Sequence, residues 1–226
     1  MILELYKPIG QTSVEFINEL KTNNPQYKKL CFAGRLDPLA CGKLCILTDE
    51  DIFKKEEFCK KNKIYETYII KGITTDTYDI MGFPQTSNKK EEIILNKFDQ
   101  KYPPYSSIII PKYHKPYWLV TKLNLPLNDE DIPTKNVEIQ KIEQLDNFTM
   151  DSKELLNLIE NRINKVNINQ QFRQKEIILK WKELLKHEKI YNIIKLQITC
   201  SSGTYIRNIG NMLNGCCYDI CRIQYN

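Results

Sequence analysis

Residues 191–210, YNIIKLQITCSSGTYIRNIG, combine the patterns of a strand and a helix in one short stretch. In its first half, Ile194, Leu196 and Ile198 recur at every second position, which is the period of a strand. Residues 203–213 follow the turn SSG and are predicted to form a helix. The chain is therefore predicted to mix strands with helices.

Similar patterns outside this stretch predict the other elements. Thr12 and Glu15 have the spacing of a capping box, so a helix is expected to begin there. Residues 105–135 place prolines among tyrosine, histidine and tryptophan, which predicts an irregular functional loop with aromatic anchors. The expected strands are 2–6, 44–48, 64–73, 136–147, 191–200 and 221–223, the expected loop is 34–42, and further helices are expected over 87–99, 151–165 and 203–213.

Length and composition limit the class of protein. The chain has 226 residues with 33 Lys and Arg against 28 Asp and Glu, so its formal net charge is +5. This length predicts one domain, and this charge does not by itself indicate a polyanionic partner. No apolar run approaches the roughly 18 residues of a membrane span, and Glu4 and Lys7 interrupt the N-terminal segment. We expect a soluble protein of the cytoplasm, with the nucleus or an organelle as open alternatives.

The eight cysteines are predicted to be free thiols, because a chain without an export signal is not expected to carry a disulfide framework. Two pairs, Cys41 with Cys45 and Cys217 with Cys221, have C-x3-C spacing, and both histidines lie far from them in sequence. No metal is expected. A four-cysteine zinc site is the alternative.

Four segments carry residues that point to chemistry. They are residues 7–13 (KPIGQTS), 34–42 (GRLDPLACG), 63–65 (KIY) with the later 75–77 (TDT), and 202–207 (SGTYIR). In this order and at these spacings they resemble the motifs of the TruB-type pseudouridine synthases, the family whose bacterial member makes pseudouridine 55 in the TΨC arm of transfer RNA. The resemblance extends over residues 1–85 and 190–224, and more loosely over 103–106 and 115–117.

The resemblance implies an α+β fold, with a mixed, mainly antiparallel sheet, flanking helices and a central cleft. It implies a single catalytic domain over residues 1–226. Because the chain stops at Asn226, the C-terminal RNA-binding domain of PUA type that is usual in the family is expected to be absent. Residues 103–135 are then expected to form a mobile, thumb-like insert that contacts RNA.

Asp37 is the predicted catalytic residue. It lies between Leu36 and Pro38 in a glycine-bounded loop, which can hold its carboxylate at the mouth of a cleft. A carboxylate can act as a nucleophile or take a proton without a further base to activate it. A lone Leu-Asp-Pro would also fit an aspartate that only begins a turn, and the companion motifs favour the catalytic role. Attack on the ribose and removal of a ribose proton remain alternatives.

Three further residues are expected to bind the substrate. The family arginine that matches Arg207 pairs with the catalytic aspartate, so the resemblance implies a contact between Arg207 and Asp37. Tyr65 matches the tyrosine that the family places against the target uracil, and an aromatic ring suits a base taken out of its stack. Tyr205, two residues before Arg207, belongs to the same group. An exposed arginine and core tyrosines are the alternatives.

Residues around these are expected to support the site. Lys7 and Pro8 match the family's first motif, which supports the catalytic loop, and Gly34 begins that loop; simple surface charge is the alternative for Lys7. Asp79, like Asp76 before it, matches a polar turn that borders the RNA in the family, and Asp79 is expected to bind substrate. A turn capped by Asx hydrogen bonds would explain both aspartates equally well.

Two residues depart from the family pattern and are also expected to bind substrate. Phe32 stands where transfer RNA enzymes of the family commonly have a histidine, and its ring can stack but cannot change charge. Arg35 replaces a small residue and resembles the Arg-Leu-Asp motif of other pseudouridine synthase families. It is expected to enter the space left by the flipped base or to hold a phosphate, with an exposed arginine as the alternative.

The resemblance implies isomerisation of a uridine in RNA to pseudouridine, at position 55 of the transfer RNA TΨC stem-loop, by a monomer without cofactor or metal. One alternative is the same reaction on ribosomal or small nuclear RNA, with a partner or guide RNA. The other is an RNA-binding or RNA-folding protein that keeps the motifs without turnover.

Overall fold

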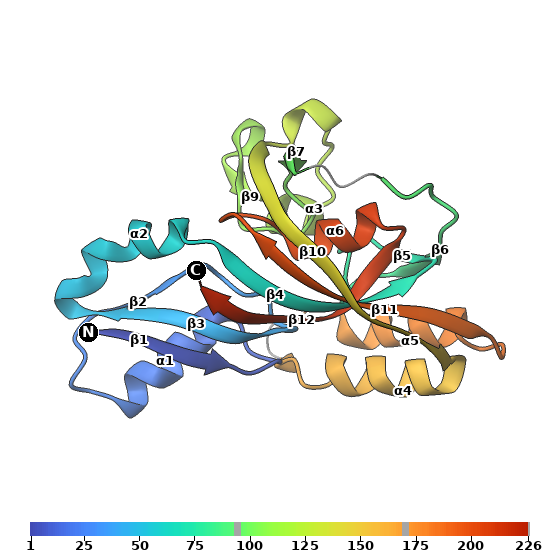
Figure 1. The fold of residues 1–226 in the computed structure, drawn as a ribbon, viewed down its shortest axis with the longest axis horizontal. Coiled ribbons are helices and arrows are strands. Elements are labelled where there is room, and N and C mark those ends of the chain that lie inside the picture. Colours follow the sequence, from blue (N-terminus) through green and yellow to red (C-terminus); the bar gives the residue numbers. More distant parts are fainter. Residues whose placement is uncertain (93–95, 169–171, 226) are drawn as a thin grey trace.

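An eight-stranded sheet forms the centre of the computed structural model, which describes residues 1–92, 96–168 and 172–225 (Figure 1). Adjacent strands of this sheet pair antiparallel, except for one parallel pair. The prediction of a mixed, mainly antiparallel sheet is therefore confirmed. In spatial order the strands are β1 (Ile2–Lys7), β3 (Ala40–Thr48), β12 (Gly215–Tyr225), β4 (Lys63–Lys71), β11 (Ile190–Cys200), β10 (Thr134–Asp151) and β7 (Lys97–Lys101), while β2 (Leu30–Ala33) pairs with β3 and the parallel pair is β3 with β12.

Helices cover both faces of this sheet. In Figure 1, α4 (Ser152–Ile163) and α5 (Gln174–Leu184) lie below the sheet, and α6 (Ile206–Met212) lies above it. The remaining helical segments are α1 (Ser13–Asn23), α2 (Lys55–Lys60), α3 (Tyr117–Lys122), η1 (Asp49–Lys54), η2 (Pro111–Tyr113) and η3 (Asp129–Asp131), and the short strands are β5 (Ile73–Thr75), β6 (Pro84–Thr86), β8 (Ile109–Ile110) and β9 (Lys115–Pro116).

The two faces bury separate clusters of apolar side chains. Ile193 packs with α4 and α5, whereas its neighbour Ile194 packs with α6. On β4, Ile70 and Ile69 divide in the same way, and both are fully buried. Successive side chains of a strand point to opposite faces, so a central strand buried on both sides is apolar at consecutive positions. This explains why 191–200 is richer in isoleucine than simple alternation requires.

The start of α1 follows the sequence-based prediction. The Thr12 hydroxyl accepts a hydrogen bond from the Glu15 amide at 3.1 Å, and the Glu15 carboxylate accepts one from the Thr12 amide at 2.8 Å. This reciprocal capping box satisfies two amides that the helix itself cannot pair. It fixes the point at which residues 7–13 turn away from the sheet.

The prediction of a helix over 87–99 was wrong in its described part. Residues 97–101 form strand β7, which pairs with residues 134–138 of β10. Ile93 and Ile94 lie outside the described residues. The strand buries Gln100, whose side-chain amide donates to the Gly203 carbonyl and accepts from the Tyr205 amide. These distant partners favour an extended conformation, which the local apolar spacing could not reveal.

Two other elements differ from the expectations. Strand β3 begins at Ala40, so the expected loop over 34–42 is shorter than predicted. Helix α5 was not predicted, although Ile177 and Trp181 have the i, i+4 spacing of a buried helix face and are both fully buried. The segment that contains α5 is rich in Lys and Asn, and for this reason no helix was predicted there.

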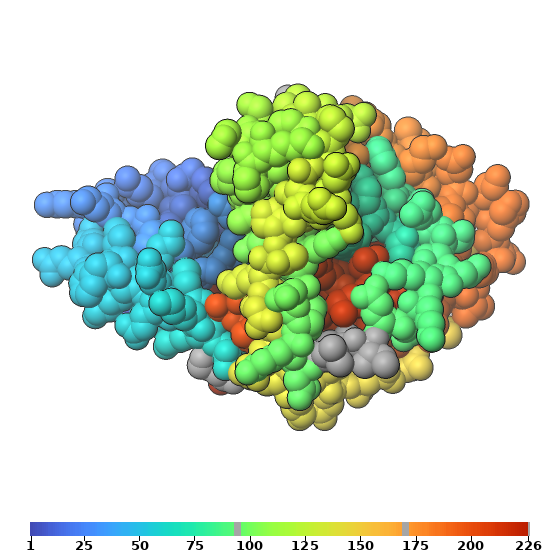
Figure 2. All heavy atoms as spheres, turned by 90° about the horizontal axis from the view of Figure 1, so that it is seen from above, coloured from blue at the N-terminus to red at the C-terminus, as the bar shows by residue number. Residues whose placement is uncertain are grey.

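The insert, residues 103–135, has a small core of its own. Ile110, Tyr117 and Val120 are buried together, which gives this segment more order than the predicted irregular loop. It contains short elements from β8 to η3. In Figure 2 the insert stands as a yellow-green ridge across the middle of one face, between the cyan residues around α2 and the green turn that follows β5.

None of the described helices has the length and apolar character that crossing a membrane requires. All eight cysteines lie in the described residues and are free thiols, as predicted.

Trp181 provides a test of how α5 is held. Its ring is fully buried, and its indole N–H donates to the Ile80 carbonyl at 3.1 Å. We expect Trp181→Ala to lower the free energy of unfolding by about 3–5 kcal/mol, because it leaves a cavity and an unpaired carbonyl. Urea unfolding followed by circular dichroism measures this. Leu179→Ala is the matched control, since Leu179 is 65% exposed on the same helix; equal losses in the two variants would contradict the proposed packing.

Candidate active site

A cavity of about 390 Å³ lies on the α6 face of the sheet. Asp37, Tyr65, Tyr205 and Arg207 all line it, although they come from three separate parts of the chain. The insert closes one side with residues 105–107. The volume is within the range of sites that hold small ligands.

The loop that carries Asp37 is held from below by residues 7–13. The Ser13 hydroxyl accepts from the Leu36 amide at 2.9 Å and donates to the Leu36 carbonyl at 3.0 Å. The Gly10 amide donates to the Pro38 carbonyl at 2.8 Å. These bonds fix both neighbours of Asp37, whereas its own side chain is 32% exposed. The carboxylate is thus rigidly placed and open to the cavity.

Lys7 supports this arrangement from a fully buried position. Its ammonium donates to the Pro8 carbonyl at 2.8 Å and to the Gln11 carbonyl at 2.6 Å, which closes the turn that contains Gly10. Burial lowers the pKa of Lys7 to about 8, although Cys41 and Asp37 oppose the shift. A buried, bonded ammonium is inconsistent with the alternative of simple surface charge.

Arg207 forms the expected contact with Asp37. Its guanidinium is buried, with Nε 2.8 Å from Asp37 Oδ2 and 3.8 Å from Asp79 Oδ2. Nη1 donates to the Thr77 carbonyl at 2.7 Å. Among the described residues no acceptor is aligned with the Nε–H, so the contact with Asp37 is mainly electrostatic. One cation therefore orients the Asp37 carboxylate and fixes it to the 75–79 turn.

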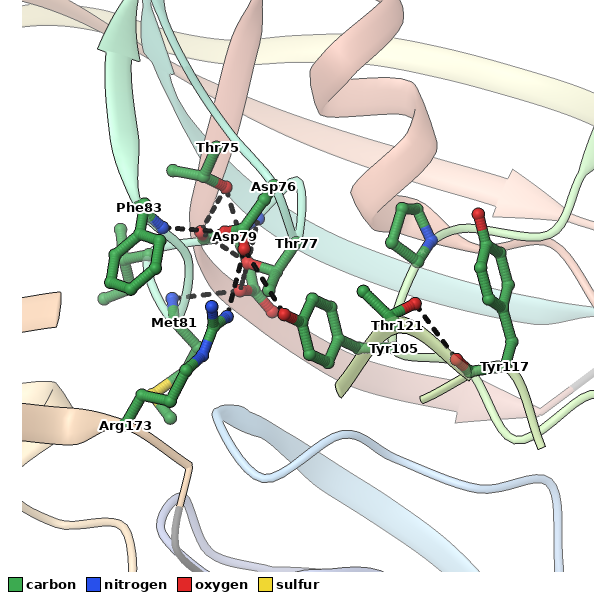
Figure 3. A network of polar contacts seen from close by, with 12 residues as sticks. Thr75, Asp76, Thr77, Asp79, Met81, Phe83, Tyr105, Tyr117, Thr121 and Arg173 are labelled. Carbon is green, nitrogen blue, oxygen red and sulfur yellow. Dashed lines mark hydrogen bonds and ion pairs between the residues drawn. The ribbon is translucent and has the colours of Figure 1, made fainter. Parts of the chain in front are cut away.

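Asp79 lies behind Arg207 and does not line the cavity. Its carboxylate accepts from the Thr77 hydroxyl at 2.6 Å and from the Met81 amide at 2.9 Å, an Asx-type cap (Figure 3). Burial raises the pKa of Asp79 to about 6, and Arg207 limits this rise. The geometry therefore favours the capped-turn interpretation of Asp79 and makes it a partner of Arg207.

Asp76 faces a different way in the same turn. It accepts from the Phe83 amide at 2.7 Å and forms an ion pair with Arg173 at 3.0 Å. The Tyr105 hydroxyl donates at 3.4 Å to Oδ2, the oxygen that also pairs with Arg173, as Figure 3 shows. Asp76 thus joins the turn to the insert and to the residue that precedes α5.

Tyr65 and Tyr205 form aromatic walls of the cavity. Tyr65 is 7% exposed on β4, and its hydroxyl accepts from Arg222 Nη1 at 3.4 Å. Burial raises the pKa of Tyr65, while Arg222 opposes the rise. Tyr205 packs edge-on against Tyr102, with ring centroids 5.6 Å apart. Burial and the nearby Asp37 carboxylate raise the pKa of Tyr205 to about 12, so it is a neutral phenol near pH 7.

Arg35 and Phe32 lie further out. Arg35 is exposed, lines the cavity and donates to the Ser107 hydroxyl of the insert at 2.8 Å. Its guanidinium lies 5.8 Å from the centre of the Phe32 ring. Phe32 is half-buried on β2 and does not line the cavity. Gly34, which does line it, has a φ of +77°, a backbone conformation that favours glycine.

Sequence reasoning missed Arg222. This residue of β12 is 1% exposed and lines the cavity. Its guanidinium donates to the Lys43 carbonyl at 2.7 Å and to the Gly34 carbonyl at 3.0 Å, besides its contact with Tyr65. An arginine within a strand that is otherwise rich in apolar residues was the signal that could have identified it.

Within the described part of the chain, no three side chains of His, Cys, Asp or Glu lie together in a way that could hold a metal ion. Cys41 and Cys221 are opposite each other on β3 and β12, but neither C-x3-C pair gathers into a four-cysteine cluster.

Comparisons with known proteins identify the family of the chain. The family model described as TruB family pseudouridylate synthase (N terminal domain) matches residues 22–146, more than half of the chain. The chain is 30% identical over 229 residues to tRNA pseudouridine synthase B of Mycoplasma mobile, covering 96% of this chain and 65% of that protein. It is 26% identical to tRNA pseudouridine synthase B of Endomicrobium trichonymphae, covering 94% of this chain and 78% of that protein.

The fold also resembles a solved structure, the crystal structure of a Cbf5-Nop10-Gar1 complex. The TM-score is 0.52 at 17% sequence identity, covering 99% of this chain and 48% of the matched one. At this identity the likeness concerns the fold alone. The chain spans less than two thirds of the length of the first of these relatives.

The raised pKa of Asp79 predicts a pH-dependent stability. In the unfolded chain Asp79 ionises near 3.8, but in the folded protein it ionises near 6. Its contribution is therefore full below about pH 4 and is lost as the pH rises through 6. Relative to Asp79→Asn, the wild type is expected to lose about 3 kcal/mol of unfolding free energy over this window.

Urea unfolding of both proteins at intervals from pH 3.5 to 7.5 measures this difference. Curves that stay parallel over the whole range would show that burial does not perturb Asp79.

Proposed function

Because the chain belongs to the TruB family of pseudouridylate synthases, we propose that it isomerises a uridine of RNA to pseudouridine, at position 55 of the transfer RNA TΨC stem-loop. The single observation that carries the proposal is the Asp37 carboxylate, which is open to a cavity, aligned by buried Arg207 and faced by Tyr65 and Tyr205. The protein is proposed to act as a monomer in the cytoplasm.

The reaction breaks the bond between ribose C1′ and uracil N1 and forms a bond between C1′ and C5. The C5 proton leaves and N1 gains a proton, so the product has the composition of the substrate. No electrons are exchanged with another molecule, and for this reason no redox cofactor is proposed. What the protein must supply is a group that handles the sugar, a surface that holds the freed base, and a proton acceptor.

Asp37 is proposed to act on the sugar. Its carboxylate either attacks C1′ or removes a ribose proton, and both steps require it to face the ribose of an extruded nucleotide. Arg207 restricts the direction of the carboxylate, since the buried guanidinium offers a fixed positive charge 2.8 Å away. Ser13 and Gly10 keep the loop from moving when the nucleotide enters.

Tyr65 is proposed to hold the uracil while it turns and, in its phenolate form, to accept the C5 proton and become a phenol. Its ring is part of the cavity wall, and its oxygen accepts from Arg222, whose positive charge favours the phenolate that this step requires. Tyr205 is proposed to form a second wall for the base. Asp79 is proposed to act only through Arg207.

The insert is proposed to contact the RNA beside the target nucleotide. Trp118 is 42% exposed on it, and Arg35 joins its Ser107 to the catalytic loop. The insert, which forms the ridge in Figure 2, lines the cavity with residues 105–107 and is proposed to offer lysine and aromatic side chains to a bound stem-loop.

Loss of Asp37 tests the proposed reaction. Wild-type protein is expected to release tritium from transfer RNA transcripts that carry 5-tritiated uridine, because C5 loses its hydrogen as the new bond forms. Asp37→Ala is expected to release none while it still binds the transcript. A transcript with cytidine at position 55 is the substrate control.

Three other results have distinct meanings. Release from ribosomal or small nuclear RNA alone would move the reaction to another substrate. Binding without release from any RNA would favour the silent RNA-binding protein. Equal release by wild type and Asp37→Ala would exclude Asp37 as the catalytic group.

The Tyr65 hydroxyl can be tested apart from its ring. Tyr65→Phe keeps the stacking surface, so the Kd for the transcript should stay within about twofold of wild type. The turnover rate should fall by about 100-fold or more if the Tyr65 oxygen takes the C5 proton. Single-turnover tritium release measures the rate, and Tyr68→Phe, on the opposite face of the sheet, is the control. A wild-type rate in Tyr65→Phe would assign proton removal to another group.

A further inference from the structure

One end of the active-site cavity is lined by cations without a carboxylate partner. Lys63 is 4% exposed and Arg222 is 1% exposed, and both line the cavity together with Lys135. Lys63 donates to the carbonyls of Cys59 and Lys61, and Arg222 donates to carbonyls and to the Tyr65 hydroxyl. Among the described residues, neither cation forms an ion pair.

The two cations lie close to each other. A Cβ placed on Gly34 would be 3.4 Å from Arg222 Nη1 and 3.5 Å from Lys63 Cε. The two charged groups also share the Tyr225 ring, at 5.6 Å for Lys63 and 4.8 Å for Arg222. Because Gly34 has no side chain, nothing from this position covers the cations on the cavity side.

Such an arrangement is costly for a protein with no anion to bind. Burying an ionised group costs several kcal/mol unless an opposite charge or hydrogen bonds compensate it, and two like charges side by side repel each other. The effect is visible on Lys63, whose pKa burial and Arg222 together lower to about 8. The carbonyls and the aromatic ring offset part of this cost, but they add no negative charge.

We propose that Lys63 and Arg222 form a subsite for a backbone phosphate of the RNA, next to the target uridine. The inference rests on the proposed function and extends it by naming how the nucleotide's backbone is held. The subsite opens into the cavity that contains Asp37, and Gly34 is three positions before Asp37 in the chain. A phosphodiester bound there anchors the extruded nucleotide at its backbone while Asp37 faces its sugar. Lys135 borders the same anion.

The first experiment measures the charge contact by its salt dependence. Binding of a TΨC stem-loop RNA is measured from 50 to 300 mM salt in an Asp37→Ala background, which prevents turnover. Losing one phosphate contact reduces the slope of log K against log salt by about 0.7–0.9. Lys63→Met and Arg222→Met are expected to lose this amount, together with about ten- to hundredfold in affinity.

Lys195→Met is the matched control. Lys195 lies on β11, pairs with Glu66 at 2.8 Å and lies over the Tyr68 ring, on the opposite face of the sheet. The Lys195→Met variant should bind the RNA with the same affinity, and with the same slope of log K against log salt, as the Asp37→Ala background. A slope unchanged in both Lys63→Met and Arg222→Met would overturn the proposal.

The second experiment locates the phosphate. The phosphodiesters on either side of the target uridine are replaced, one at a time, by an uncharged methylphosphonate. At one of these positions the replacement should weaken binding to the Asp37→Ala background, but should weaken binding to Lys63→Met no further. In Lys195→Met the replacement should weaken binding as much as it does in the Asp37→Ala background. If the losses multiply for Lys63→Met at both positions, Lys63 does not contact a phosphate next to the uridine.

A purely structural role gives a different result. Lys63 caps carbonyls at the end of α2, and Arg222 holds Gly34 and Tyr65, so either variant could lower the Tm. A structural role alone lowers the Tm and leaves the salt slope and the methylphosphonate effect at background values. Arg222→Lys, which keeps the charge, should restore the slope even if the Tm stays low.

Two outcomes separate this inference from the proposed function. Tritium release by the wild type together with unchanged slopes in both variants would overturn the subsite alone. Absence of RNA binding by the wild type would overturn both. Calorimetric binding of inorganic phosphate that requires Arg222, without any methylphosphonate effect, would assign the subsite to free phosphate and contradict the RNA contact.

Discussion

The buried guanidinium of Arg207 is the contact on which the candidate site depends. It lies between the carboxylates of Asp37 and Asp79 and donates to the carbonyl of Thr77. An arginine can be buried only when opposite charges and acceptors surround it, so each of these groups must be in place for the others to be stable. The Asp37 loop, the turn after β5 and the first turn of α6 are therefore positioned together.

Contacts outside the Arg207 cluster also help to fix the position of the Asp37 carboxylate. Ser13 and Gly10 fix the backbone on either side of Asp37, and Gln100 fixes the turn that leads into α6. These supports come from residues far apart in the sequence. They use backbone hydrogen bonds, which tolerate little displacement, so the position of one carboxylate is determined by most of the upper face of the sheet.

The cavity is also distinguished by the positive charge buried around it. Lys7, Lys63, Arg207 and Arg222 are buried around the 34–37 loop, whereas the carboxylates of Asp37 and Asp79 both pair with Arg207. A net positive interior next to an open cavity suits a polyanionic substrate, and the overall charge of +5 does not reveal it. What distinguishes the site is where the charges are buried, and the exposed lysines elsewhere are ordinary surface residues.

The sequence by itself determined the identity of the chemical groups and most of the local elements. Asp37, Tyr65 and Arg207 stood out because of their motifs, and the strands 2–6 and 191–200 and the capping box at Thr12 followed from short-range patterns. These features depend on neighbours along the chain, which a sequence displays directly. The tertiary structure alone decided that residues 97–101 are a strand, that Asp79 supports Arg207, that Phe32 lies away from the cavity, and that Arg222 lines it. Each of these depends on a partner many residues away, because burial and hydrogen bonding between distant segments override local preference and set the cost of every buried charge.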